Sequence, residues 1–183
     1  MTWKAFHNRG DTLRSVIATA AVRRDGLLPM DVPGVAEAFR DELDLLAALT
    51  LKWHTRLSGN VEQMLAHQPT DLDEAVSVAW SNTAHELAGV RMIIDHHRAH
   101  PLDDAMSRAM ESAASKEHYL LAVMAGRASL LSEEAALRAG AEIEERARLL
   151  HRGIPVIAPD TAVEEEPVAR ATLLERLRAV IAA

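Results

Sequence analysis

Cysteine is absent from the 183 residues of this chain. A disulfide framework, a thiolate nucleophile and a thiolate-ligated metal site are therefore excluded. Aromatic residues make up only 3% of the sequence. A core with so few aromatic side chains must be built from alanine and aliphatic residues, which suits close helix packing better than β-sheets. The composition therefore favours an all-α protein.

Long apolar runs and clustered cations are missing as well. No apolar run reaches the roughly 20 residues that span a bilayer, and residues 1–10 have no apolar signal-peptide core. We therefore expect a cytoplasmic protein without a membrane partner. The 20 Lys and Arg residues are outnumbered by 27 Asp and Glu residues, which gives a net charge of -7. This charge argues against a nucleic-acid partner, because phosphate contacts need clustered cations.

Apolar residues recur at spacings of three and four along most of the chain, which predicts helices rather than strands. A first helix is expected from Asp11 to about Arg24, after an N-terminal arm anchored by Trp3 and Phe6. Four further helices are expected over residues 35–66, 70–100, 104–126 and 132–151, with a possible break of the first of them at Gly59. Because the turns between them are short, sequential helices should form an antiparallel up-down-up-down bundle.

The helical pattern divides the chain after residue 152. Residues 1–152 are expected to form one helical bundle domain that includes the N-terminal arm, since the chain is long enough for one well-buried core. Residues 153–183 are expected to be an appendage, made of an extended apolar connector and an amphipathic helix. The apolar face of that helix is Leu173, Leu174, Leu177, Val180 and Ile181. Such a helix wraps its own bundle or docks on another subunit, and the sequence leaves both possibilities open.

Helical geometry places several histidines and glutamates at one height of the predicted bundle. In an antiparallel pair of helices, residues at equal distances from the turn face each other. This rule gathers one polar layer, which consists of His54, His85, Glu86, Glu117, His118 and Glu144. Glu117 falls on the apolar face of its helix, so we expect it to point inward.

Two interpretations of this layer are open. Imidazoles and carboxylates that converge from facing helices can bind a divalent metal, and mixed nitrogen and oxygen ligands suit Fe, Mn or Zn. The predicted ligands are His54, His85, Glu86 and Glu117, with the two glutamates as ligands or bases. Alternatively, the layer is a buried polar network in which Glu117 is ion-paired with a histidine for structural reasons.

His96 and His100 form a second candidate pair, because residues four apart lie on one face of a helix. Pro101 places His100 at or beyond the helix end, so histidines favoured by the helix dipole are the alternative. The chain has no Glu-x-x-His motif, which ferritin-like di-iron bundles need. Hemerythrin-like bundles also need His-x-x-x-Glu, which is absent. His54, His96 and His100 match the number of histidines in the metal site of DinB-type enzymes. In the predicted bundle, however, His54 lies about three helical turns away from the other two. We therefore assign the chain to no family.

Sequence motifs do not identify a catalytic residue. No nucleophile elbow, phosphate-binding glycine loop or dinucleotide fingerprint occurs. The first hypothesis is therefore self-association or partner binding through the arm and the C-terminal helix, with a homodimer favoured. The second is a metal-binding protein or metal-dependent enzyme that uses the polar layer. A regulator with a ligand pocket inside the bundle is a third option.

Overall fold

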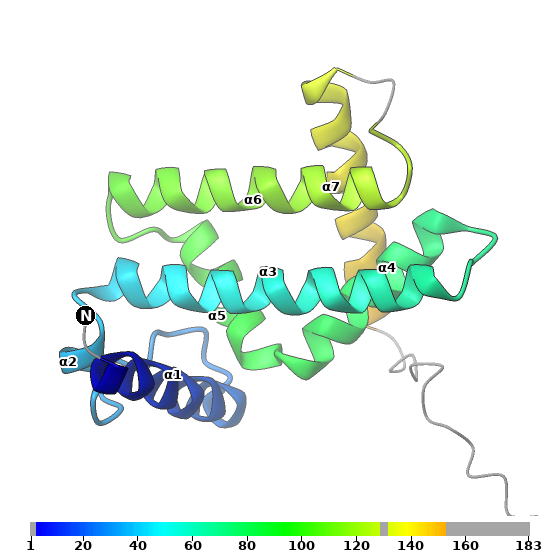
Figure 1. Cartoon of the computed structure of the whole chain (residues 1–183). Coiled ribbons are helices and arrows are strands. Elements are labelled where there is room, and N and C mark those ends of the chain that lie inside the picture. Colours follow the sequence, from blue (N-terminus) through cyan, green and yellow to red (C-terminus); the bar gives the residue numbers. More distant parts are fainter. Residues whose placement is uncertain (1–2, 129–131, 153–183) are drawn as a thin grey trace, which may run out of the picture.

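The computed structural model describes residues 3–128 and 132–152, with side chains from Arg9 onward. Within these ranges the chain forms seven α-helices and no strand, which confirms the expected all-α class (Figure 1). The helices are α1 (Trp3–Arg23), α2 (Val35–Ala38), α3 (Glu42–Ala66), α4 (Leu72–Glu86), α5 (Ala88–Ala99), α6 (Asp104–Met124) and α7 (Glu133–His151). None of these helices combines the length and the apolar character needed to cross a membrane.

The structure describes only part of each end of the chain. The expected connector and helix of residues 153–183 lie outside the described residues, as do the side chains of Trp3 and Phe6. The backbone is helical from Trp3, well before the predicted start at Asp11. Asp11 pairs with Arg14 instead of capping a helix. Residues 3–10 therefore continue the first helix and do not form a separate arm.

The predicted helix over residues 35–66 is interrupted near its start. Phe39 has an extended backbone conformation. Asp41 then caps α3, because its side chain accepts a hydrogen bond from the backbone N–H of Asp44 at 2.7 Å. Gly59, the expected weak point, lies inside the uninterrupted α3. The break is therefore set by the cap and not by the glycine.

The predicted helix over residues 70–100 bends at Leu87. Its backbone dihedrals (φ -117°, ψ 38°) are not helical, and they separate α4 from α5. Gly89, two residues later, lies against the backbone of Ala20 in α1, where a Cβ atom would come within 2.2 Å. The bend thus directs α5 onto α1 at a crossing that only glycine fits.

α3 is the central helix of the fold. It contacts α1, α4, α5 and α6. Figure 1 shows α3 and α6 running side by side, with the bend between α4 and α5 lying below α3 in this view. These contacts are compatible with the expected order of the bundle. The fully buried side chains of α3 are Leu45, Leu46, Leu49, Trp53, Leu57 and Val61.

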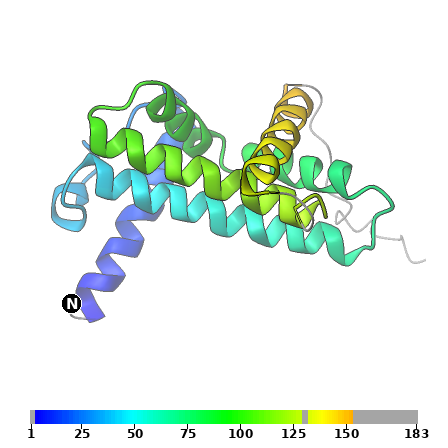
Figure 2. The ribbon, with the colours of Figure 1, turned by 90° about the horizontal axis from the view of Figure 1, so that it is seen from above.

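α7 crosses α6 steeply in both views (Figures 1 and 2). The crossing is lined by the small residues Ala122, Ala136 and Ala139. At its closest point, a Cβ atom on Gly140 would lie 1.9 Å from the backbone oxygen of His118. α7 also packs against α4. Small side chains in α6 and α7 therefore let these two helices approach closely, while α7 also contacts α4.

Candidate functional site

Glu117 is the centre of a buried polar network in the described part of the chain. It is 3% exposed, on the apolar face of α6, as expected from the sequence. The indole N–H groups of Trp53 in α3 and Trp80 in α4 donate to its carboxylate oxygens at 3.1 Å and 2.8 Å. The two indole rings pack edge to face, with centroids 5.5 Å apart. Both tryptophans are therefore hydrogen-bond donors as well as packing residues.

Arg91 of α5 supplies the positive charge opposite Glu117. Its side chain is buried, and Nη1 donates to the two carboxylate oxygens at 2.9 Å and 3.2 Å. The guanidinium carbon lies 4.8 Å from the ring centroid of Trp53 and 5.1 Å from that of Trp80, within range of cation–π attraction. A buried carboxylate must be paired and hydrogen-bonded to stay ionised. Glu117 meets this condition through three neighbouring side chains.

The network continues from Arg91 into α7. Nη2 of Arg91 donates to Asp95 at 2.6 Å and to Glu144 at 3.2 Å. Arg148, one turn after Glu144, donates to both of these carboxylates at 2.7 Å. Arg98 donates to Glu144 at 3.2 Å. The three carboxylates of the network are thus matched by three arginines.

Two histidines border the network. His118 Nε2 lies 2.6 Å from an oxygen of Glu144. His54 Nε2 lies 3.5 Å from Oε2 of Glu117, which is longer than an ordinary hydrogen bond. The cavity that His54 and Glu117 share has a volume of about 10 Å³, enough for about one water molecule. A substrate does not fit beside the Glu117 carboxylate in this cavity.

The carboxyl groups of the network have lowered pKa values. Burial acts to raise the pKa of Glu117, but the charge of Arg91 opposes it and the pKa falls below its ordinary range. Burial likewise acts to raise the pKa of Glu144, and the hydrogen bond with His118 and the neighbouring arginines lower it overall. These carboxylates therefore stay ionised at neutral pH and are weak proton acceptors.

The structure brings together two of the four predicted metal ligands. His54 and Glu117 approach each other, whereas Glu86 pairs with Arg56 near the surface and His85 faces α7. In the described residues, no three His, Asp or Glu side chains form a group that could hold a metal ion. The Fe, Mn or Zn site stays a prediction. The contacts favour the alternative interpretation, a buried network, with an arginine as the main partner of Glu117.

The bend at Leu87 explains why the predicted layer differs from the observed one. The equal-height rule assumes one straight helix over residues 70–100. The bend directly follows His85 and Glu86, so the positions of these residues along α4 no longer fix their height relative to α6. In the structure, Glu86 pairs with Arg56 of α3 and His85 contacts His151 of α7.

The arginines of the network were not predicted as site residues. Arg91 follows Leu87 by four positions and precedes Ile94 by three, so it lies on the same helical stripe as these two apolar residues. That spacing is the signal that predicts an inward-facing arginine. A buried Glu117 on the neighbouring helix then requires such a cation.

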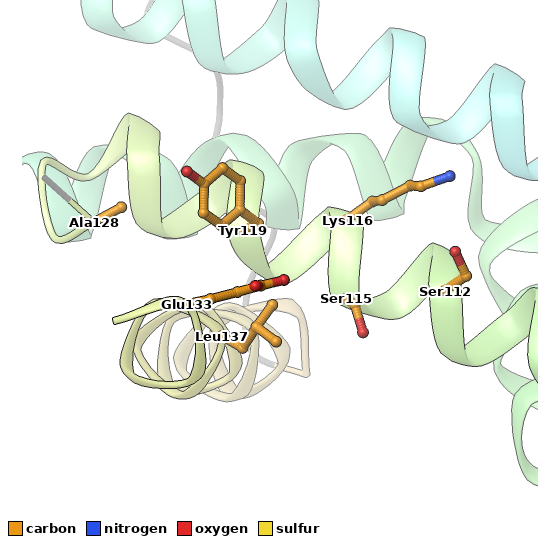
Figure 3. Close-up of a pocket in the computed structure, with 7 residues that line it drawn as sticks. All are labelled: Ser112, Ser115, Lys116, Tyr119, Ala128, Glu133 and Leu137. Carbon is orange, nitrogen blue, oxygen red and sulfur yellow. The ribbon is translucent and has the colours of Figure 1, made fainter. Parts of the chain in front are cut away.

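Two open hollows lie on the described surface outside the network. One, of about 600 Å³, lies between α6 and α7 (Figure 3). In Figure 3 the side chain of Lys116 of α6 points away from Glu133 of α7. The other, of about 530 Å³, lies between α1 and α3 and is mostly apolar. We call it the α1–α3 hollow.

Neither a protein-family model, nor a curated protein, nor a solved structure matches this chain. The chemistry of the network and of the hollows is therefore inferred from the residues that form them.

The free energy of unfolding is expected to fall as the pH is lowered from 7 towards 3. Asp95, Glu117 and Glu144 have folded-state pKa values below their ordinary values near 4. The stability that they contribute is therefore complete above about pH 5 and is lost as the pH falls through the folded-state pKa values. Urea unfolding followed by tryptophan fluorescence at several pH values measures this loss. A stability that stays constant from pH 7 to pH 3 would contradict it.

Proposed function

We propose that this chain acts by self-association, and that the α1–α3 hollow of one copy receives residues 167–183 of a second copy. The apolar lining of the hollow carries the proposal. Leu13 of α1 and Ala47, Ala48 and Leu51 of α3 line it, and Leu51 is 68% exposed. An apolar hollow of this size on a protein surface is typical of a binding site.

The chain beyond α7 supports this choice of occupant. Residues 167–183 carry apolar residues at helical spacing, which is the pattern of an amphipathic helix that binds in a groove. The 14 residues from 153 to 166 reach about 45 Å when extended. This reach exceeds the length of α3, whose 25 residues extend over about 37 Å. The segment is therefore long enough to reach a hollow on a neighbouring molecule.

Polar residues at the α1–α3 hollow fit the same proposal. Arg9 and Asp44 form an ion pair at 3.0 Å, and Lys52 and Thr55 also line the hollow. Stable interfaces commonly combine an apolar centre with a polar rim. The residues of the hollow provide both parts.

Light scattering on the full chain, separated by size over a range of concentrations, tests the proposal. We expect a dimer, with twice the 20.0 kDa mass of one chain. Leu51→Lys should give a monomer, because it places a charge on the apolar lining of the hollow. Leu51 is largely exposed, so this substitution should leave the fold intact.

Leu149→Lys is the matched control. Leu149 is 59% exposed on α7, outside the hollow, and its replacement should leave the dimer unchanged. Deletion of residues 167–183 should give a monomer, as Leu51→Lys does. A monomeric wild-type chain, or a dimer that survives either change, would overturn the proposal.

A further inference from the structure

The two ends of the α1–α3 hollow differ in charge. The α3 residues that line it lie on one face of the helix, from Asp44 at one end to Lys52 and Thr55 at the other. Asp44 and Thr55 are about 16 Å apart along the helix axis, given the rise of an α-helix. The apolar residues Ala48 and Leu51 lie between them. A helix bound in the hollow therefore meets a different charge at each of its ends.

The charges at the Asp44 end are balanced. The carboxylate of Asp44 lies 3.0 Å from the guanidinium of Arg9 and 3.7 Å from that of Arg40. Asp41, the N-cap of α3, adds a second carboxylate at this end. Lys52, at the other end, is exposed and has no ion-pair partner among the described residues. Within the described part of the chain, the hollow therefore has an unpaired positive charge only at its Lys52 end.

The segment proposed as the occupant of the hollow also has unlike ends. Three consecutive glutamates, residues 164–166, stand directly before it. Two of its three arginines, Arg176 and Arg178, lie in its second half. Acidic residues at the start of a helix and basic residues near its end are typical of helix termini. The negative charge of the occupant is therefore clustered at one end.

We propose that, in the dimer of the proposed function, on which this inference rests, residues 167–183 of the second copy run antiparallel to α3. Glu164, Glu165 and Glu166 then lie beside Lys52 and balance its charge. The apolar residues of the segment cover the apolar centre of the hollow.

Helical spacing agrees with the antiparallel order. Leu173, in the middle of the apolar face of the segment, is centred over Ala48, in the middle of the hollow. Glu166 precedes Leu173 by seven positions, and Thr55 follows Ala48 by seven. Because both helices have the same rise per residue, Glu166 is level with Thr55 in the antiparallel order. The side chain of Lys52, one turn away on the same face, is then within reach of the glutamates.

The parallel order brings like charges together. It would place Glu166 level with Asp41 and leave Lys52 without a counter-charge. Arg176 would then lie beside Lys52, whereas the antiparallel order places it beside Asp44. Like charges that meet at an interface oppose binding, and complementary charges fix the orientation of a partner. Charge complementarity therefore favours the antiparallel order.

Disulfide cross-linking measures the direction of the bound segment, because the chain has no cysteine of its own. Thr55→Cys combined with Glu166→Cys should form a disulfide between two chains on mild oxidation, since these positions are level in the antiparallel order. Arg40→Cys combined with Glu166→Cys is the matched control for the parallel order and should form none. Thr55 and Arg40 are exposed, so both substitutions should leave the fold intact. A Thr55→Cys pair that forms no covalent dimer, or a control pair that does, would overturn the proposal.

Charge reversal tests the role of Lys52. Lys52→Glu in the full chain should weaken the dimer about tenfold at low salt, as measured by analytical ultracentrifugation. Addition of Glu164→Lys, Glu165→Lys and Glu166→Lys to this variant should restore the dissociation constant of the wild type. Lys116→Glu makes the same change of charge on an exposed lysine of α6, outside the α1–α3 hollow, and should leave the dimer unchanged.

The orientation can fail without the self-association. A wild-type dimer that Leu51→Lys disrupts, but that Lys52→Glu weakens no more than Lys116→Glu does, would overturn the antiparallel order alone. A monomeric wild-type chain would overturn the proposed function and the antiparallel order together.

Discussion

Glu117→Gln is expected to lower the free energy of unfolding by about 3–5 kcal/mol, the usual cost of removing one partner from a buried ion pair. Glutamine keeps an oxygen for one indole N–H group but no negative charge for Arg91. The buried guanidinium would lose one of its three carboxylate partners and keep only Asp95 and Glu144. Urea unfolding at pH 7, followed by tryptophan fluorescence, measures the loss. The same signal reports local repacking, because Trp53 and Trp80 both contact Glu117.

Glu86→Gln is the control for this prediction. Glu86 was predicted from the sequence to share a metal site with Glu117, but its ion pair with Arg56 is about half exposed. An exposed pair contributes about 0–1 kcal/mol, so this substitution should have a small effect. Equal stability of the two variants would contradict the view that Glu117 holds the core together.

A second substitution separates lost charge pairing from lost packing. Arg91→Met introduced into Glu117→Gln removes the buried guanidinium that has lost its Glu117 partner, so part of the lost stability should return. A double variant that is less stable than Glu117→Gln would show that Arg91 stabilises the fold mainly through its other contacts, with Asp95, Glu144 and the two tryptophan rings.

Gly140→Ala is expected to destabilise the protein by about 3 kcal/mol or more, at the upper end of what overpacking costs. The added Cβ would lie 1.9 Å from the backbone oxygen of His118 and 2.4 Å from its carbonyl carbon. Backbone atoms cannot rotate away as a side chain can, so α7 must move off α6. This movement would also lengthen the 2.6 Å contact between His118 and Glu144.

Gly59→Ala is the matched control on α3. No heavy atom outside the local helix lies within 4 Å of a Cβ at this position. Alanine is favoured over glycine in a helix interior by about 1 kcal/mol, so the control should be slightly more stable than the wild type. Thermal and urea unfolding of both variants measure the difference. A neutral Gly140→Ala would mean that the α6–α7 crossing is looser than described.

Part of the network could be predicted from local sequence because helical periodicity reports the inward face. Glu117 falls on the apolar stripe of its helix, and its burial follows from that position. The approach of His54 to Glu117 also agrees with the predicted layer. His85 and Glu86 were placed with the wrong partners, because a bend of one residue at Leu87 changes the register between helices.

Composition and periodicity by themselves determined the all-α class and most helix ends, because caps and apolar spacing are local properties of the chain. Asp103 and Ser132 cap α6 and α7 close to the predicted starts of these helices. Only the tertiary structure decided which charges meet. The pairing of Glu117 with Arg91 joins residues 26 positions apart, and it depends on the angle between α5 and α6. The contact between His85 and His151 depends in the same way on where α7 crosses α4, a property that no local pattern encodes.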